Sequence, residues 1–265
     1  MKKIILSLAI FASLLGAKKL VILEPSVVEM MYMLDSESDI AAISKLTMSK
    51  IWPAEKTEKL PSVGTYSKPN IEKIIEIKPD LVVTGFHAES IKDELGKFNI
   101  GVLGLKSDSL DDIYNNVLKI GEILDKNEKA KQLVNDIKQS VDKFLNSKFK
   151  GKKIAILFSS NPIMAFNNKS LVGDIFSKFG FINIADGLSG QTPIISSEVL
   201  LAKNPDFIIV VGGMGSKEAI LSSNEALKNV NAVKNDKVIT IPSSLLLRGT
   251  PRIKENMSEI FEMLK

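Results

Sequence analysis

The chain has no cysteine and a single histidine, His87, among its 265 residues. Without cysteine it can form no disulfides, no thiolate metal sites and no thiol nucleophiles. One histidine cannot build the multi-histidine site that a zinc or manganese receptor needs. The lack of cysteine is compatible with export, because an exported chain without thiols cannot mispair in an oxidising compartment.

Arginine is almost as scarce, since only Arg248 and Arg252 stand among 35 lysines and arginines. The formal net charge is +4 at pH 7, and Lys2 and Lys3 contribute two of these charges. Removal of a leader that contains both lysines leaves a charge near +2, which is too weak to argue for nucleic-acid binding. After residue 17 no stretch approaches 18 consecutive apolar residues, so no later membrane span is expected.

The first 17 residues read MKKIILSLAIFASLLGA, with two lysines, an apolar run and then small residues. This order is typical of a signal peptide, which predicts that residues 1–17 are removed and that the mature protein works in the periplasm. Position 17 is alanine rather than cysteine, so no lipid anchor is expected. The alternative is a buried first helix or strand of a cytosolic domain.

One sequence pattern occurs twice, 126 positions apart. Glu72 is followed seven residues later by Pro79-Asp80 and the apolar run LVV, and Glu198 is followed seven residues later by Pro205-Asp206 and FIIVV. In each copy a carboxylate suits the N-terminal dipole of a short helix, the proline ends that helix, and the apolar run is typical of a buried parallel strand. The repeat predicts two similar α/β lobes with a ligand cleft between them.

The rest of the chain alternates short apolar strands with helices, which predicts parallel sheets with right-handed crossovers. Residues 47–69 carry three prolines and no period, so they are expected to form a loop. Apolar residues recur at three and four over 127–149, which predicts one long amphipathic helix. The expected organisation is an N-terminal lobe over 18–125, an inter-lobe helix over 126–150 and a C-terminal lobe over 151–265.

Four segments carry a family resemblance: residues 61–83, 159–185, 195–212 and 232–242. They resemble substrate-binding proteins of bacterial ABC importers, in the class with one long inter-lobe helix that handles iron–siderophore complexes, haem and cobalamin. The resemblance implies a monomeric receptor, not an enzyme, that delivers its ligand to a permease dimer with a cytoplasmic ATPase. It also implies that Glu72 and Glu198 dock onto arginines of the permease. The alternative for both glutamates is helix capping alone.

Three unusual residue types are candidates for ligand binding. Arg248 and Arg252 could clamp an anionic ligand, since arginine offers a planar two-pronged donor, or could pair with Glu255 or Glu259 on the last helix. Haem-binding relatives place an iron-ligating tyrosine directly after a Val-Gly pair. Here Thr65 separates that pair from Tyr66, so Tyr66 is favoured as a stacking wall over an iron ligand.

His87 follows a predicted strand, where the carboxyl ends of parallel strands face the crevice. It could supply one ligand to a chelated metal, or simply be exposed. Apolar and aromatic side chains at strand ends or in loops could complete the wall of the site. These are Trp52, Phe86, Met164, Phe166 and Met214, of which Met164 and Phe166 could equally belong to the core.

The sequence therefore favours a periplasmic receptor for a ferric siderophore or haem, with no intrinsic cofactor. Cobalamin or a nickel chelate is the alternative ligand. An alternative of another class is a two-lobed enzyme similar to a glycosyltransferase. The signal-peptide pattern argues against that enzyme, and the glycines at 212, 213 and 215 lack the spacing of a dinucleotide-binding fingerprint.

Overall fold

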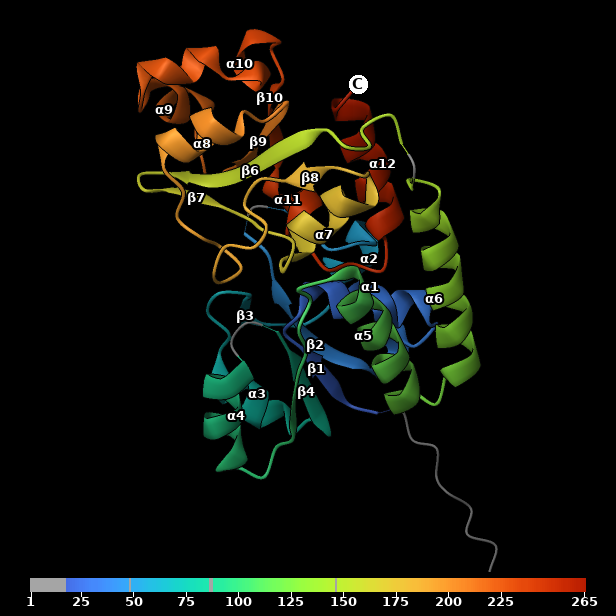
Figure 1. The fold of residues 1–265 in the computed structure, drawn as a ribbon. Coiled ribbons are helices and arrows are strands. Elements are labelled where there is room, and N and C mark those ends of the chain that lie inside the picture. Colours follow the sequence, from blue (N-terminus) through green and yellow to red (C-terminus); the bar gives the residue numbers. More distant parts are fainter. Residues whose placement is uncertain (1–17, 48, 86–87, 146) are drawn as a thin grey trace, which may run out of the picture.

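The computed structural model describes residues 18–47, 49–85, 88–145 and 147–265, and they form two α/β lobes (Figure 1). The N-terminal lobe is built on a five-stranded, wholly parallel sheet in the order β3-β2-β1-β4-β5. Its strands are β1 (Leu20–Ile22), β2 (Ile40–Lys45), β3 (Ser62–Thr65), β4 (Leu81–Thr84) and β5 (Val102–Gly104). Its helices are α1 (Pro25–Met33), η1 (Glu37–Asp39), α2 (Ala54–Thr57), α3 (Ile71–Ile77), α4 (Ala88–Gly96) and α5 (Leu110–Ile123).

The C-terminal lobe has a second five-stranded sheet, in which β10, β9, β6 and β7 are neighbours in that order and β8 also pairs with β6. All its pairings are parallel except that of β6 with β7. Its strands are β6 (Lys153–Ser160), β7 (Ile163–Ala165), β8 (Ile182–Asn183), β9 (Phe207–Gly212) and β10 (Val238–Pro242). Its helices are α7 (Leu171–Lys178), α8 (Ser197–Lys203), α9 (Lys217–Ser222), η2 (Glu225–Asn229), α10 (Asn231–Lys234), α11 (Ser243–Leu246) and α12 (Ile253–Met263).

The two sequence repeats fold into equivalent helix–turn–strand units, α3–β4 and α8–β9. Lys78 and Asn204 end the two helices in the left-handed conformation, with φ of 49° and 45°. The aspartate that follows each proline then ties the unit to the central strand of its sheet. Asp80 Oδ2 accepts from the backbone N–H of Lys19 at 2.7 Å, and Asp206 Oδ2 accepts from that of Lys153 at 2.9 Å. The predicted two-lobed fold with parallel-sheet cores is confirmed, and β7 is its one antiparallel addition among the described strands.

The helix between the lobes is shorter than predicted. The sequence predicts one helix over 127–149, within an inter-lobe segment of 126–150, but α6 covers only Asn127–Asp142. Its 16 residues span about 24 Å. Beyond Asp142 the chain turns, and the Phe144 ring packs against those of Phe179 and Phe261 at 5.4 and 5.6 Å. The apolar pattern continues past the helix because Phe144 and Phe149 both pack against Phe261, whereas Leu145 is exposed.

The expectation of an irregular loop over 47–69 is partly wrong, because this segment contains α2 and the edge strand β3. Strand β3 is only four residues long and includes Gly64 at a φ of 103°. Such a short strand with a glycine shows no alternation of apolar and polar residues from which a strand could be predicted. Its pairing with β2 is a tertiary contact. Strand β3 matters for the site because Tyr66 follows it directly.

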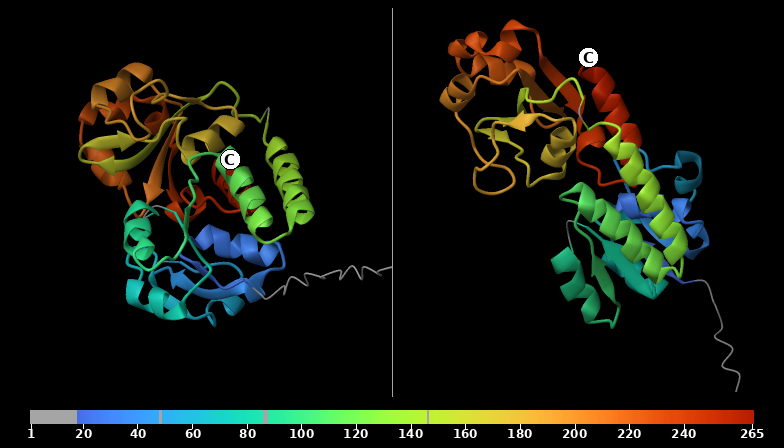
Figure 2. Two further views of the ribbon diagram at one scale, coloured as in Figure 1. Left: turned by 90° about the horizontal axis from the view of Figure 1, so that it is seen from below. Right: turned by 45° about the vertical axis from the view of Figure 1, so that its right-hand side comes forward.

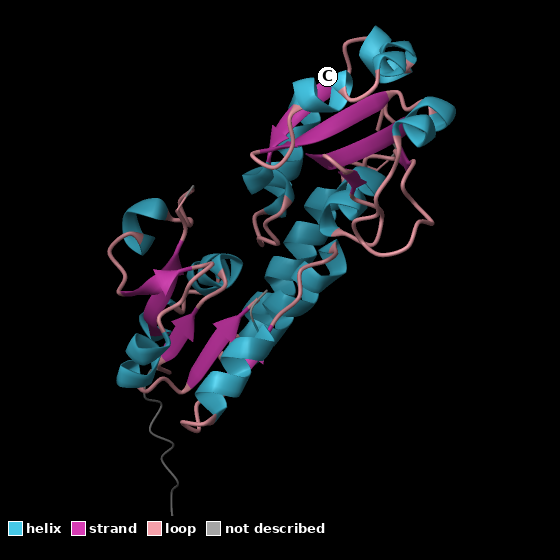
Figure 3. Cartoon of the chain, turned by 90° about the vertical axis from the view of Figure 1, so that its left-hand side faces the viewer, coloured by secondary structure: helices cyan, strands magenta, loops and turns pink. Residues whose placement is uncertain are grey.

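One hydrophobic cluster is shared by the lobes and contains buried residues of both sheets and of α1, α5, α6, α7 and α12, and each lobe also has a smaller cluster of its own. Helix α5 contacts α6 and α7, and α6 contacts α12 (Figure 2, right). Figure 3 shows these helices running from one sheet towards the other. The backbone N–H of Leu110 on α5 also donates to Asp174 Oδ2 on α7 at 2.8 Å. Within the described ranges no helix is both long and apolar enough to cross a bilayer.

Candidate functional site: two adjoining cavities where the lobes meet

The larger cavity, of about 500 Å³, lies at the carboxyl ends of β1, β4 and β5, where ligands of α/β sheets usually bind. The C-terminal lobe contributes the loop between α11 and α12 to its wall. The lining residues are Glu24, Tyr66, Gly85, Gly104, Leu105, Lys106, Ser107, Asp108, Leu247 and Gly249. Polar side chains therefore face the cavity from the N-terminal lobe, opposite an apolar and glycine-containing loop of the other lobe.

A second cavity of about 310 Å³ adjoins the first and shares Glu24, Tyr66 and Leu247 with it. Its other lining residues are Pro25, Leu46, Ser243, Ser244 and Arg248. The three shared residues make the two cavities one continuous candidate site, to which both lobes contribute.

Glu24 lies between the two cavities. Its Oε1 accepts from the Ser26 hydroxyl at 3.1 Å and from the Ser26 N–H at 3.4 Å, and its carboxylate also accepts from the Tyr66 hydroxyl. Burial raises the pKa of Glu24 above its ordinary value, despite these hydrogen bonds and the charge of Arg248. A Cβ atom on Gly85 would lie 2.1 Å from Glu24 Oε2, so the glycine leaves the space that the carboxyl group occupies.

The two lobes touch directly beside the larger cavity. A Cβ atom on Gly249 would lie 2.3 Å from the Cβ of Ser107, so glycine is needed where these loops meet. The Ser107 loop is itself fixed, because Asn116 Nδ2 donates to the carbonyl of Lys106 at 2.7 Å and to Ser107 Oγ at 3.2 Å. The shape of the cavity therefore depends on a close backbone approach between the lobes.

Arg248 lines the smaller cavity, but its guanidinium is already bound by the N-terminal lobe. It donates to Ser49 Oγ at 2.8 Å, to the Lys50 carbonyl at 3.2 Å and to Glu29 Oε1 at 3.4 Å. The Thr250 hydroxyl donates to the other oxygen of Glu29. The alternative that Arg248 pairs with Glu255 or Glu259 is thus wrong. Its partner is the buried Glu29 of α1.

Burial raises the pKa of Glu29, while the Thr250 hydrogen bond and the charges of Arg248 and Arg252 act to lower it. Arg252 lies over the ring of Trp52, with its guanidinium carbon 5.1 Å from the ring centroid. Neither residue lines the two cavities. The two arginines therefore hold the α11–α12 loop against the N-terminal lobe, which the sequence could not show because the contacts join residues about 200 positions apart.

The other predicted wall residues are scattered. Phe166 is only 9% exposed and its ring packs on Phe158 at 4.6 Å, which places it in the core. Met164 is half-buried on β7 and Met214 is exposed. Phe86 and His87 lie outside the described residues. In the part of the chain that the structure describes, no group of three His, Asp or Glu residues could hold a metal ion.

The two glutamates predicted to dock onto a permease occupy equivalent places. Glu72 and Glu198 are both exposed and both stand at the second position of their helices, α3 and α8. The capping role belongs to other residues, since Asn70 accepts from the Lys73 N–H and Ser196 accepts from the Val199 N–H. Hydrogen bonds from the Ser196 hydroxyl and a backbone N–H lower the pKa of Glu198, which keeps it ionised.

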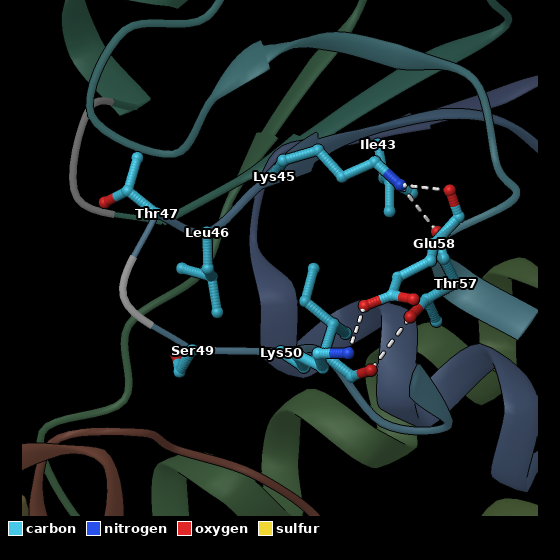
Figure 4. Close-up of a pocket in the computed structure, with 9 residues that line it drawn as sticks. Ile43, Lys45, Leu46, Thr47, Ser49, Lys50, Thr57 and Glu58 are labelled. Carbon is cyan, nitrogen blue, oxygen red and sulfur yellow. Dashed lines mark hydrogen bonds and ion pairs between the residues drawn. The ribbon is translucent and has the colours of Figure 1, made fainter. Parts of the chain in front are cut away.

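A third cavity of about 410 Å³ lies wholly within the N-terminal lobe (Figure 4). Lys45 Nζ donates to the carbonyls of Thr57 and Glu58 at 2.8 and 3.0 Å, and Lys50 Nζ pairs with Glu58 at 2.7 Å. The two lysines that line this cavity therefore already have partners, backbone carbonyls for Lys45 and the Glu58 carboxylate for Lys50. They stabilise the segment between β2 and β3, on which Tyr66 depends for its position.

Sequence reasoning missed Glu24 and the glycines at 85 and 249. Glu24 could have been predicted from the sequence, because it is a carboxylate that comes shortly after an apolar strand and precedes a proline. The end of a parallel strand at the crevice is a position where a charged residue points to function. The glycines could not have been predicted, since each is required by a contact with a residue distant in the sequence.

Residues 20–245 match the family described as periplasmic binding protein. The chain is 28% identical over 240 residues to the petrobactin-binding protein YclQ of Bacillus subtilis (strain 168), an alignment that covers 86% of this chain and 75% of YclQ. It is 26% identical over 228 residues to the high-affinity heme uptake system protein IsdE of Staphylococcus aureus (strain MRSA252), which covers 81% of this chain and 76% of IsdE.

The fold is similar to the crystal structure of a possible iron-binding (periplasmic solute-binding) protein from Staphylococcus epidermidis ATCC 12228. The TM-score is 0.81 at 25% identity, and the match covers 94% of this chain and 99% of that one. These relatives are binding and uptake proteins, as the resemblance read from the sequence predicts, and nothing among them supports a sugar-transferring enzyme. With a family match over most of its length and this fold, the chain belongs to the periplasmic binding protein family.

Proposed function

We propose that this protein is the receptor of an ABC importer and that it binds a ferric siderophore in the two adjoining cavities. The observation that carries the proposal is the lining of the larger cavity, where Lys106 and Ser107 supply hydrogen-bond donors from one lobe. Anionic chelator oxygens suit hydroxyl and ammonium donors. The similarity to YclQ, a petrobactin-binding protein, supports the same ligand class.

Haem is less well supported as the ligand. The feature that would favour it is an iron-ligating tyrosine, but the Tyr66 hydroxyl donates to the Glu24 carboxylate. A phenol held as a donor to a half-buried carboxylate is poorly placed to become a phenolate ligand of iron. Tyr66 is therefore proposed as a wall residue that hydrogen-bonds or stacks against the chelate.

The test is a titration of the mature protein, without residues 1–17, with a ferric catecholate siderophore, a ferric trihydroxamate, haemin and cyanocobalamin. Quenching of Trp52, the only tryptophan, reports binding, and the Soret band reports haem ligation. Saturable quenching by a ferric siderophore with no Soret shift is expected. Tight haemin binding with a Soret shift that Tyr66→Phe abolishes would replace the siderophore with haem.

Lys106→Ala should weaken siderophore binding about fivefold, which corresponds to about 1 kcal/mol for an ion pair at an exposed cavity mouth. The matched control is Lys119→Ala, because Lys119 is an exposed lysine on α5 that pairs with Glu122 away from the cavities. Equal affinity of the Lys106→Ala variant and the wild type would remove Lys106 from the site.

The proposal extends to the place of work and the partner. The leader pattern over 1–17 and the alanine at 17 support export to the periplasm without a lipid anchor. The exposed Glu72 and Glu198, one on each lobe, support docking of a monomeric receptor on a permease dimer in the inner membrane. Binding between the lobes and docking through both lobes would let the permease engage the ligand-loaded protein.

A further inference from the structure

Glu24 is the polar side chain best placed to contact any ligand of this site. It lines both cavities, and of the residues shared between them only Glu24 carries a carboxyl group. A ligand large enough to occupy both cavities must pass beside it. The question is what chemical group of the ligand the carboxyl group would meet.

The position of the carboxyl group is defined by the surrounding structure. One oxygen is held by the Ser26 hydroxyl and N–H, and the Tyr66 hydroxyl also donates to the carboxylate. Gly85 lacks the Cβ atom that would approach the other oxygen to 2.1 Å. Helix α1, β4 and the residue after β3 thus cooperate to place this one carboxyl group at the junction of the cavities.

The carboxyl group has neutral donors around it but no cation of its own. Among the described residues no lysine or arginine forms an ion pair with Glu24, and the nearby Arg248 is engaged by Glu29, Ser49 and the Lys50 carbonyl. Lys106 and Asp108 line the larger cavity from the β5–α5 loop, where Lys106 is exposed. Glu24 is half-buried, and a carboxylate partly withdrawn from water without a cationic partner is costly, so a cation brought by the ligand would gain the most here.

We propose that Glu24 is a specificity-determining residue that accepts a hydrogen bond from an amine of the ligand. The inference rests on the proposed function and narrows it to ferric chelates that carry a primary or secondary ammonium group. The ligand then lies with its ammonium group at Glu24 and its chelating oxygens towards Ser107 and Lys106. Haem has no such amine, so this arrangement also selects against it.

The test compares two probes that differ only in the amine: a ferric trihydroxamate with a pendant primary amine, and its N-acetylated derivative. Affinities are measured by calorimetry on the wild type, Glu24→Gln and Gly85→Ala. Glu128→Gln is the control, because Glu128 is an exposed glutamate on α6 far along the chain from the site. We expect the wild type to prefer the amine form at least tenfold, and Glu24→Gln to lose that preference while Glu128→Gln keeps it.

Gly85→Ala gives a second measure that retains the charge. Its new Cβ atom displaces the Glu24 carboxyl group, so the preference for the amine form should shrink even though the glutamate remains. A preference that survives Glu24→Gln, or equal binding of both probes by the wild type, overturns the inference alone. If the wild type binds neither trihydroxamate but binds another ferric chelate, the inference fails and the proposed function stands. If it binds no ferric complex, both fail.

Discussion

At the residue scale, the defining feature of this protein is a half-buried carboxyl group at the junction of two cavities. Glu24 is stabilised there by hydrogen bonds from Ser26 and Tyr66, yet burial is the largest influence on it and raises its pKa. The folded protein therefore binds a proton at Glu24 more tightly than the unfolded chain does, whose pKa is near 4.5. Ionisation of Glu24 at this site therefore lowers the stability of the folded protein.

This leads to a prediction about pH. A raised folded pKa means that Glu24 contributes stability that is fully present below pH 4.5 and is lost as the pH rises through the folded pKa. Glu24→Gln, which cannot ionise, should therefore become more stable relative to the wild type as the pH rises from 4.5 towards neutral. Urea unfolding of both proteins over this range measures the difference, which removes the contributions of the other carboxylates. A difference that is constant with pH would show that Glu24 titrates normally.

At the element scale, the unit of helix, left-handed turn and strand occurs once in each lobe, in equivalent positions. In each lobe it delivers a strand next to the central strand, and an aspartate fastens the two at their start. Each helix runs antiparallel to the strand that follows it. Its N-terminus therefore lies at the edge of the sheet where the strands end. Each unit thus presents an exposed glutamate on the cleft side of its lobe.

Charge reversal at both glutamates tests the proposed docking. Glu72→Lys with Glu198→Lys should reduce uptake of the ferric ligand in cells to background, while the affinity of the purified protein changes by less than about twofold. Both residues are exposed and neither lines a cavity, so the fold and the ligand site have no reason to change. Glu76→Lys with Glu128→Lys, two other exposed glutamates, is the matched control. Normal uptake by the docking variant would contradict the assignment.

At the scale of the whole molecule, the two lobes are one packing unit rather than two domains on a hinge. Their buried residues form a shared cluster through α5, α6, α7 and α12, and the α11–α12 loop is bound to the N-terminal lobe through Arg248, Thr250 and Arg252. Large rigid-body closure would have to break these contacts. Ligand binding is therefore expected to involve small motions of the cavity loops.

A shared core predicts a single unfolding transition. Trp52 fluorescence, which reports the N-terminal lobe at its contact with Arg252, and far-UV circular dichroism, which reports both lobes, should give superimposable curves. Ile260→Ala, at a fully buried position on α12, should shift both curves together and destabilise the protein by about 2–5 kcal/mol. Ile194→Ala, at a position that is 65% exposed, is the control and should shift neither. Two separate transitions would show independent lobes.

The local pattern of the chain was sufficient to predict the two lobes, the repeated unit and the helix α8 over Ser197–Lys203, because caps, prolines and apolar periods act over a few residues. It was also sufficient to single out Tyr66 and the arginines, by their rarity or their resemblance to a family pattern. It could not predict that α6 ends at Asp142, because Phe144 beyond it packs against Phe179 and Phe261, which come from other parts of the chain.

The tertiary structure alone decided how the site is assembled. In the folded chain Arg248 pairs with Glu29, and Phe166 is buried in the core. Four residues from distant parts of the sequence line one pair of cavities: Glu24, Tyr66, Gly85 and Leu247. Such groupings depend on which strand ends and loops meet in space. A short-range sequence pattern cannot predict contacts between residues about 200 positions apart. Composition and periodicity determined the kind of molecule, whereas long-range packing determined which side chains face its ligand.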